Sequence, residues 1–264
     1  MTYKIGFEMD AIRRRAEADL SDALLEIGRA GYEGTELSGL FGHSPEEVRE
    51  WAKTAGLSIF AARVGLDDFL ADPGKTVLDY RELGCDYLVI SGLTEKWKKA
   101  SNYRWLVKQL AQLGGYCDQF NIQLLYHNYD FETRLTQANG ENLLNSLCAD
   151  VPDHFLKLEL DTAWLKIAGE NPATYLAIYG GRSPAVQIKD FTETAAGPRF
   201  CPLGQGSQNI DEMVAAAVRA GAKWLIAGQE GEDALSPDAM RLSAEYLRRY
   251  RQADETGGQG IFRG

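Results

Sequence analysis

The chain has 264 residues, a formal net charge of −10, and hydrophobic (45%) and charged (25%) fractions that are ordinary for a globular protein. The acidic balance argues against a nucleic-acid-binding surface, because phosphate contacts require clustered Lys and Arg. No apolar run approaches the roughly 18 residues that a membrane-spanning helix needs, so we expect no membrane partner either. The start of the chain lacks an apolar signal region, and the four Cys form no C-x-x-C pair. Both features favour a cytoplasmic protein.

Short β-rich runs alternate with amphipathic segments of helical period along the chain. The expected strands are 3–8, 34–37, 58–63, 87–91, 122–128, 155–161, 185–189 and 224–228. The expected helices lie near 11–30, 45–55, 74–84, 101–120, 138–148, 172–179, 209–220 and 236–252. Helix start signals such as Ser44-Pro45-Glu46-Glu47 support these boundaries, as do glycines such as Gly31 after helical runs.

This alternation of strands and helices predicts a parallel sheet. Eight units in a chain of 264 residues favour a closed (β/α)8 TIM barrel over an open doubly wound sheet. No G-x-G-x-x-G follows the first expected strand, which removes the strongest cue for a dinucleotide-binding open sheet. We expect one barrel domain over residues 1–254 and a flexible C-terminal tail at 255–264.

Several expected strands end on polar residues. In the strand at 155–161, leucines occupy one face, whereas Lys157, Glu159 and Asp161 occupy the other. The active site of such a barrel lies where the carboxyl ends of its strands meet. A mouth this polar suits a polyhydroxylated ligand. Alternation along the strands predicts an inward-facing set of Glu8, Glu36, Arg63, His127, Glu159, Asp161, Gln187, Lys189 and Glu230.

Four segments, GYEGTELSG at 31–39, YHNYDFE at 126–132, LDTAW at 160–164 and QIKD at 187–190, resemble the xylose-isomerase-like TIM-barrel family. That family contains sugar (phosphate) isomerases, epimerases and inosose dehydratases. The resemblance implies a divalent metal, often manganese, held by carboxylates and a histidine at the ends of strands five to eight. It also implies proton abstraction next to a carbonyl group, which gives an enediolate whose charge must be stabilised.

The implied metal site is incomplete in this chain. By position, His127 and Asp161 match family ligands, but the strand-seven histidine is Gln187. The strand-eight glutamate position is Gly228, with Glu230 two residues further on. A neutral Gln is a poor ligand for a hard cation, and Gly supplies none.

Two outcomes therefore stay open for the cofactor. A Mn or Mg ion would be held by His127, Asp161 and Glu230, with Gln187 or Glu132 completing the shell. Without a metal, Arg63 would supply the positive charge through its guanidinium, because relatives carry a histidine at that position.

The resemblance implies a sugar isomerase or epimerase that acts by proton transfer on a monosaccharide, a sugar acid or an inosose-like ketone. A carboxylate base is expected among the rim residues, with Lys189 or Arg63 stabilising the oxyanion and His127 relaying the proton. The expected catalytic residues are Glu159, Asp161, Lys189 and Glu230. The expected substrate-binding residues are Glu36, Arg63, His127, Trp164 and Gln187.

Other interpretations stand beside this one. A lyase or dehydratase would use the same enolate chemistry, and a barrel without its metal can serve as a non-catalytic carbohydrate-binding or partner protein. Glu159 can form a structural ion pair with Lys157, and Lys189 can pair locally with Asp190. Association into a homo-oligomer also stays open.

Overall fold

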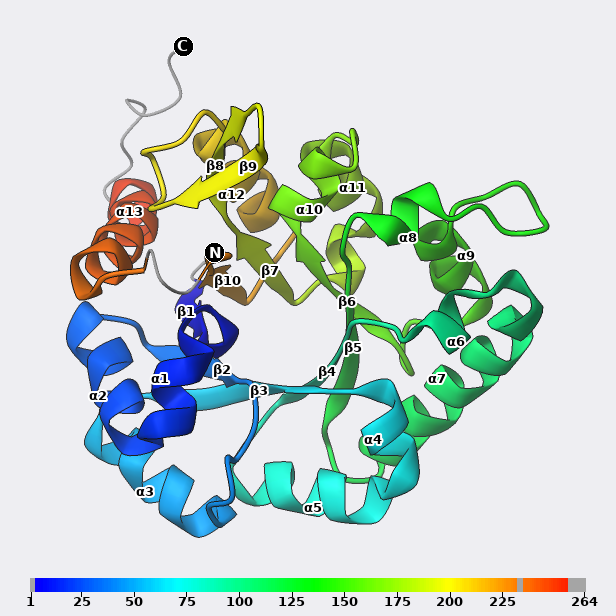
Figure 1. Ribbon diagram of the computed structural model, residues 1–264, viewed down its shortest axis with the longest axis horizontal. Coiled ribbons are helices and arrows are strands. Elements are labelled where there is room, and N and C mark those ends of the chain that lie inside the picture. Colours follow the sequence, from blue (N-terminus) through cyan, green and yellow to red (C-terminus); the bar gives the residue numbers. More distant parts are fainter. Residues whose placement is uncertain (1–2, 232–234, 256–264) are drawn as a thin grey trace.

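The computed structural model describes residues 3–231 and 235–255. Within these residues, eight parallel strands close into a barrel (Figure 1). The strands are β1 (Lys4–Glu8), β2 (Gly34–Leu37), β3 (Ser58–Val64), β4 (Tyr87–Ser91), β5 (Gln123–His127), β6 (Lys157–Asp161), β7 (Ala185–Ile188) and β10 (Trp224–Ala227). Around the barrel they follow the order β1-β10-β7-β6-β5-β4-β3-β2, so β1 closes the ring between β2 and β10. The predicted (β/α)8 TIM barrel is confirmed.

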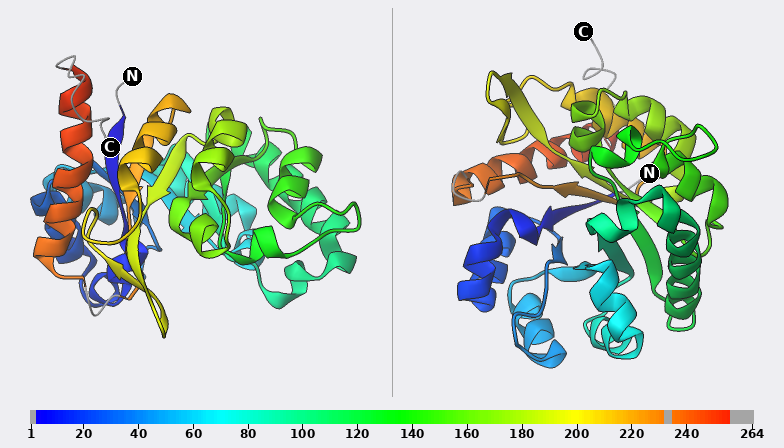
Figure 2. Two further views of the ribbon diagram at one scale, coloured as in Figure 1. Left: turned by 90° about the horizontal axis from the view of Figure 1, so that it is seen from above. Right: turned by 45° about the vertical axis from the view of Figure 1, so that its right-hand side comes forward.

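Helices surround the strands, as Figures 1 and 2 show. The longer ones are α2 (Leu20–Ala30), α3 (Pro45–Thr54), α5 (Pro73–Glu82), α7 (Tyr103–Asp118), α9 (Leu143–Asp150), α11 (Pro172–Tyr179), α12 (Ile210–Arg219) and α13 (Pro237–Glu255). None of the helices among the described residues combines the length and apolar character of a membrane span. The expected tail at 255–264 lies outside the described residues except for Glu255, which ends α13.

The single helix expected at 11–30 is wrong in detail. The chain instead forms a 3-10 turn, η1 (Met9–Ile12), then α1 (Arg13–Ala18), and then α2. Asp19 separates the two helices because its backbone is extended, with φ −155° and ψ 98°, and its side chain accepts a hydrogen bond from the Asp22 N–H. An Asp in this conformation starts a new helix rather than continuing the old one.

Short helical segments that were not expected lie in loops between the main elements. They are α4 (Leu66–Ala71), α6 (Glu95–Lys98), η2 (Ala100–Asn102), α8 (Phe131–Arg134), α10 (Thr162–Ile167) and η3 (Gly180–Arg182). Of these, α4, α8 and α10 follow β3, β5 and β6, so they border the mouth of the barrel.

A β-hairpin also extends the loop after β7, and sequence analysis did not predict it. It pairs β8 (Asp190–Thr194) with β9 (Gly197–Cys201) and projects from the barrel in the left view of Figure 2. The Asp190 carboxylate accepts backbone hydrogen bonds from Gly204, Gly206 and Gln208, which fixes the segment after the hairpin. The suggested local pair between Lys189 and Asp190 is therefore wrong.

The lower part of the barrel interior is apolar. We call its residues the apolar layer: Phe60, Ala61, Tyr87, Val89, Leu125, Ala185, Trp224 and Ile226. The rings of Phe60 and Trp224 stack with centroids 4.0 Å apart. Gly6 makes room for this pair, because a Cβ at that position would lie 2.7 Å from Phe60 Cε1. A larger apolar core lies between the barrel and its helices.

A β-bulge at Phe60 sets which face of β3 points inward. Thr35 pairs with Ile59, but Glu36 pairs with Ala61, so Phe60 is skipped in the register. Consequently Phe60 and Ala61 both belong to the apolar layer, and Arg63 lies two residues beyond Ala61 on the interior face. Without the bulge, the shift by one residue would turn Arg63 outward.

Candidate active site at the carboxyl ends of the strands

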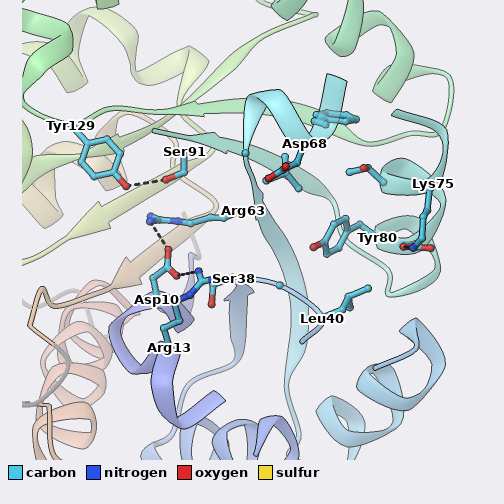
Figure 3. Close-up of a pocket in the computed structure, with 16 residues that line it drawn as sticks. Asp10, Arg13, Ser38, Leu40, Arg63, Asp68, Lys75, Tyr80, Ser91 and Tyr129 are labelled. Carbon is cyan, nitrogen blue, oxygen red and sulfur yellow. Dashed lines mark hydrogen bonds and ion pairs between the residues drawn. The ribbon is translucent and has the colours of Figure 1, made fainter. Parts of the chain in front are cut away.

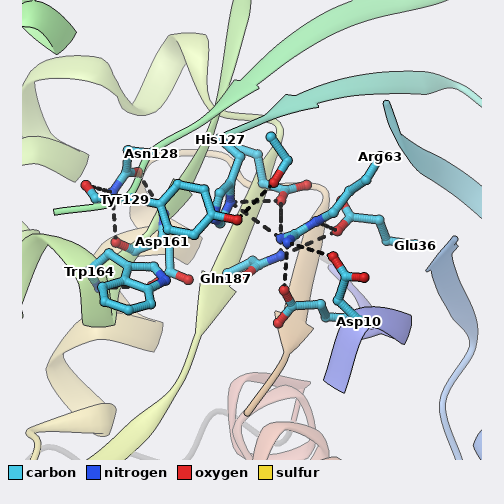
Figure 4. A network of polar contacts seen from close by, with 12 residues as sticks. Asp10, Glu36, Arg63, His127, Asn128, Tyr129, Asp161, Trp164 and Gln187 are labelled. Atoms are coloured by element: carbon cyan, nitrogen blue, oxygen red, sulfur yellow. Dashed lines mark hydrogen bonds and ion pairs between the residues drawn. The ribbon is translucent and has the colours of Figure 1, made fainter. Parts of the chain in front are cut away.

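Polar residues from six strands and the segment after β7 meet inside the barrel toward the carboxyl ends of the strands. Figure 4 shows several of them, among which are Arg63, His127 and Asp161. Each of them is buried. Most of the predicted inward-facing residues lie together here. Their catalytic and binding roles remain predictions. We call this set the charged layer: Glu8, Glu36, Arg63, His127, Glu159, Asp161, Gln187 and Lys189.

Arg63 is the hub of one half of the charged layer. Its guanidinium pairs with Glu36 through Nε and with Glu8 through Nη1 at 2.8 Å, and it also contacts Asp10 at 3.3 Å. Its Nη2 lies 3.5 Å from both Glu159 Oε1 and His127 Nδ1. Burial opposes the charged form, but these carboxylates raise the pKa of Arg63 well above its ordinary value. The guanidinium is therefore a permanent charge.

Lys189 is the hub of the other half. Its fully buried Nζ lies 3.0 Å from Glu8 Oε2, 3.0 Å from Asp161 Oδ2 and 2.8 Å from Glu230 Oε1. Burial alone would lower the pKa of Lys189, yet these carboxylates raise it well above the ordinary value. Glu8 joins the two halves, since one of its oxygens contacts Arg63 and the other contacts Lys189.

Glu8 was expected to face inward but was not included in the predicted site, although the signal, a carboxylate at the end of the first strand, was present. Burial alone would raise the pKa of Glu8, but Arg63 and Lys189 outweigh burial and lower it. Asp10, in η1 directly after this strand, was also missed. Glu8 and Asp10 thus place carboxyl groups beside Arg63, and Glu8 also contacts Lys189.

His127 and Glu159 form an acid–base pair. His127 Nδ1 lies 3.2 Å from Glu159 Oε1, and the same oxygen accepts a hydrogen bond from Gln187 Nε2 at 2.9 Å. Burial, and then Arg63 and Lys189, lower the pKa of His127 well below its ordinary value, so the imidazole is neutral. Burial and the neighbouring Glu36 raise the pKa of Glu159 well above its ordinary value. The structural pair suggested between Glu159 and Lys157 is replaced by these contacts.

Asp161 is held in place by its own backbone surroundings. Its Oδ1 accepts hydrogen bonds from the N–H groups of Ala163 (2.8 Å) and Trp164 (3.0 Å) at the start of α10. Its backbone N–H donates to Asn128 Oδ1 at the end of β5. Burial raises the pKa of Asp161, although Lys189 opposes this shift. The second oxygen, Oδ2, is thereby aimed at the Lys189 ammonium.

Glu132 orients the loop after β5 rather than contacting the predicted metal ligands. Its carboxylate accepts hydrogen bonds from the Tyr126 hydroxyl and the Tyr129 N–H, both at 2.8 Å. Burial raises the pKa of Glu132 to about 7. This loop is therefore held by a buried carboxyl whose pKa lies well above its ordinary value.

Aromatic rings cover the charged layer. The Tyr129 ring meets the His127 ring edge-on, with centroids 4.9 Å apart, and lies 5.5 Å from the ring of Trp164 (Figure 4). Trp164 continues this cover to Phe200 on the hairpin at 6.1 Å. The Tyr129 ring shields His127 from one side.

A cavity of about 520 Å³ borders the charged layer on the side of β2, β3 and β4. Arg63 and Tyr129 line it, together with Asp10, Ser38 and Ser91 (Figure 3). Its lining is largely polar, and its volume is within the range of small-molecule sites. The ion-pair network around Lys189 reaches the surface at a second place, through Glu230, whose side chain is 41% exposed.

Several buried polar atoms of the site have no hydrogen-bond partner among the described residues. They are Glu36 Oε2, His127 Nε2, Glu159 Oε2, Gln187 Oε1 and Trp164 Nε1. Buried polar groups are usually hydrogen-bonded, so such atoms are candidates for ligand contacts. This set includes every predicted substrate-binding residue except Arg63.

The predicted metal ligands do not converge on one point. Asp161 and Glu230 both contact the Lys189 ammonium, whereas His127 contacts Glu159 and Arg63. In 3–231 and 235–255, no group of at least three His, Cys, Asp or Glu is arranged to hold a metal ion. The Lys189 ammonium lies between Asp161 and Glu230, and a divalent cation does not fit in the same place.

Comparison with known proteins agrees with this architecture. An inosose dehydratase from Lacticaseibacillus casei is 24% identical over 204 residues, which cover 68% of this chain and 66% of that protein. The chain thus spans slightly less than two thirds of this relative's length. A sugar phosphate isomerase/epimerase structure from Parabacteroides distasonis ATCC 8503 has a TM-score of 0.80 at 18% identity, covering 94% of both chains.

A further solved structure, the IOLI protein with a binding zinc atom, has a TM-score of 0.73 at 16% identity and covers 95% of this chain and 98% of its own. At these identities the solved structures establish the fold alone. A family model described as xylose isomerase-like TIM barrel matches residues 24–250. Since that match spans most of the sequence, the chain belongs to the xylose isomerase-like TIM barrel family.

Proposed function

We propose that the protein is an enzyme that transfers a proton at the carbon next to a carbonyl group of a small polyhydroxylated substrate, as a sugar isomerase or epimerase does. The observation that carries this proposal is the presence of two buried carboxyl groups, those of Glu159 and Asp161, on the strand β6. Glu159 has the more strongly raised pKa, whereas Lys189 opposes the rise at Asp161. Two titratable groups with diverging pKa values are the usual arrangement of an acid and a base.

The spacing of this pair suits a small substrate. Glu159 and Asp161 lie two residues apart on the inner face of one strand, which separates their Cα atoms by about 7 Å. In the proposal, the reacting carbon and its neighbouring oxygen lie between these two carboxyl groups. We assign Asp161 as the base and Glu159 as the acid.

In the proposed step, the Asp161 carboxylate takes a proton from the carbon next to the carbonyl. The electron pair of the broken C–H bond forms the C=C bond of an enediolate, and the carbonyl electron pair moves to oxygen. Lys189 or Arg63 stabilises that oxyanion. Return of a proton from Glu159 to the same carbon, directly or through the neutral His127, completes an epimerisation. In an isomerisation the proton returns to the former carbonyl carbon, and the hydroxyl on the neighbouring carbon passes its proton to the former carbonyl oxygen as it becomes the new carbonyl.

The substrate is proposed to enter from the cavity bordered by Arg63 and Tyr129. Hydroxyl groups of a monosaccharide, a sugar acid or an inosose-like ketone can pair with the unpartnered atoms of Glu36, Gln187 and Trp164. Movement of the Tyr129 ring would open the path to His127, because the ring meets the imidazole edge-on and borders the cavity.

A dehydratase is the second candidate. It is favoured by the name of the curated relative, inosose dehydratase, and by the raised pKa of Glu159. A protonated carboxyl can donate its proton to a departing hydroxyl, so that the enediolate loses water instead of regaining a proton. Both candidates share the first proton transfer and differ in the second step.

Solvent-deuterium exchange tests the shared step. Protein is incubated in D2O with ketoses, aldoses, sugar acids and inosose-like ketones, and NMR reports deuterium uptake next to the carbonyl. We expect uptake with at least one compound, and water loss would identify the dehydratase. Asp161→Asn keeps an oxygen for the Ala163 and Trp164 N–H groups, so it should fold and lose roughly 10²–10⁴-fold in rate.

The exposed Asp153→Asn is the matched control and should exchange normally. Binding of a sugar without exchange or elimination would contradict the proposal and favour a non-catalytic carbohydrate-binding protein. Unchanged exchange in Asp161→Asn would refute the assignment of the base.

A further inference from the structure

The strand-eight position Gly228 and the buried Lys189 belong to one arrangement. A Cβ at Gly228 would collide with Glu8 Oε2 and would lie 2.7 Å from Lys189 Cε. The space that a longer side chain at 228 would need is therefore filled by the carboxylate of β1 and the lysine stem. A glycine is required here because both groups pass close to its backbone.

The Lys189 ammonium lies at the centre of an oxygen cluster. Glu8, Asp161 and Glu230 each place a carboxylate oxygen within 3.0 Å of Nζ. Glu8 Oε2 and Asp161 Oδ2 make no hydrogen bond within the described residues, so the ammonium charge itself compensates them. Removal of one partner from such a buried set leaves an uncompensated charge.

The three carboxylates of this cluster are the ligands that a hard cation prefers, but the Lys189 ammonium already occupies the space between them. Divalent cations bind carboxylate oxygens at about 2.0–2.6 Å and would have to approach the oxygens that surround Nζ. Two positive charges at one buried point repel each other strongly. Lysine and metal therefore exclude each other here.

We propose that Lys189 is the built-in cation of this site and that the site works without a divalent metal. The inference rests on the proposed function for its chemistry, since the ammonium then neutralises the enediolate oxygen. Its structural part stands independently: the ammonium occupies the position that a metal would need. Lys189 remains charged while its carboxylate partners are ionised.

Manganese binding tests this inference without any activity measurement. Protein is freed of metal with a chelator, dialysed and titrated with Mn²⁺, and EPR reports the unbound ion. We expect the wild-type chain to leave the free signal unchanged. Lys189→Met vacates the centre of the cluster and should remove one equivalent of Mn²⁺ per chain from the free signal.

The exposed Lys166→Met provides the control for loss of a lysine and should behave as wild type. Wild-type protein that binds one equivalent of Mn²⁺ would overturn the inference, as would a folded Lys189→Met that gains no binding. If Lys189→Met does not fold, the Mn²⁺ titration of the wild-type protein alone tests the inference. A failure of the deuterium exchange leaves this test intact, so the two proposals can fail separately.

Discussion

The apolar layer and the charged layer share strands β3, β5 and β7, and on each of these strands the two layers lie two residues apart. Leu125 is followed by His127 on β5, and Ala185 by Gln187 on β7. Along a strand this step is about 7 Å, and it takes the interior from close-packed side chains to a network of ion pairs. The apolar layer stabilises the barrel by burial, whereas the charged layer holds buried ion pairs, whose loss of hydration opposes folding.

The two layers should also differ in how they depend on pH. Burial of apolar area carries no titratable group. The charged layer depends on Glu8, whose lowered pKa contributes stability above its ordinary value and loses it as the pH falls through the lowered value. Glu159 acts in the opposite sense, because its raised pKa reduces stability as the pH rises above the ordinary value.

Loss of Arg63 should have the largest effect on stability. Arg63→Met leaves Glu8, Glu36 and Glu159 buried without their shared cation and should cost about 3–5 kcal/mol at pH 7. The difference from wild type should shrink towards pH 4, because Arg63 no longer lowers the pKa of Glu8 in the variant and Glu8 then takes up a proton. Urea unfolding at both pH values checks this, and an equal loss at both would contradict the ion-pair account.

Glu132 offers a gain in stability. In Glu132→Gln the amide oxygen can accept from the Tyr129 N–H while its NH₂ donates to Tyr126, as a protonated carboxyl does. Because the pKa of Glu132 is raised to about 7, the wild-type chain loses stability between its ordinary value and pH 7. The variant should match wild type at pH 5 and be about 2–3 kcal/mol more stable at pH 8.

Chemical unfolding over this pH range measures that difference. The exposed Glu193→Gln on the hairpin serves as the control and should follow wild type at every pH. A variant that is equally stable relative to wild type at both ends of the range would show that Glu132 does not titrate near neutral pH.

A substitution in the apolar layer should lower the stability by a smaller amount, and this loss should not depend on pH. Phe60→Leu weakens the stack on Trp224 and should cost about 1–2 kcal/mol. Thermal or urea unfolding at pH 5 and pH 8 should give the same loss. A loss that varies with pH would mean that the two layers are coupled through the bulge of β3.

Tyr129 should give the smallest effect. Tyr129→Phe keeps the ring on His127 but loses the contact with Ser91 Oγ at 3.1 Å, which should cost about 1 kcal/mol. Urea unfolding measures the loss, and ligand affinity reports on the cavity that both residues line. A loss of several kcal/mol would show that the hydroxyl fixes more than this contact.

The fold could be predicted because the strands and helices are separated by strong local signals. Ser44 caps α3 as its sequence predicted and also forms a capping box with Glu47, and Gly31 ends α2 with φ 95°. The hairpin after β7 was missed because its pairing depends on the loop at 203–208, which Asp190 fixes from a distance in sequence.

The members of the charged layer could be predicted better than their contacts. Alternation places His127, the last residue of β5, and Gln187, the penultimate residue of β7, inside the barrel. Alternation does not say which long side chain reaches which partner. Glu8 contacts both Arg63 and Lys189. The position of Arg63 depends on the bulge of β3, and the position of Lys189 depends on the space next to Gly228.

The most direct test of the whole account is deuterium exchange by chelator-treated protein. The charged layer is predicted to exchange the proton next to the carbonyl at the same rate before and after metal removal, and to lose that exchange in Asp161→Asn. Exchange that disappears with the chelator and returns with added Mn²⁺ would contradict it.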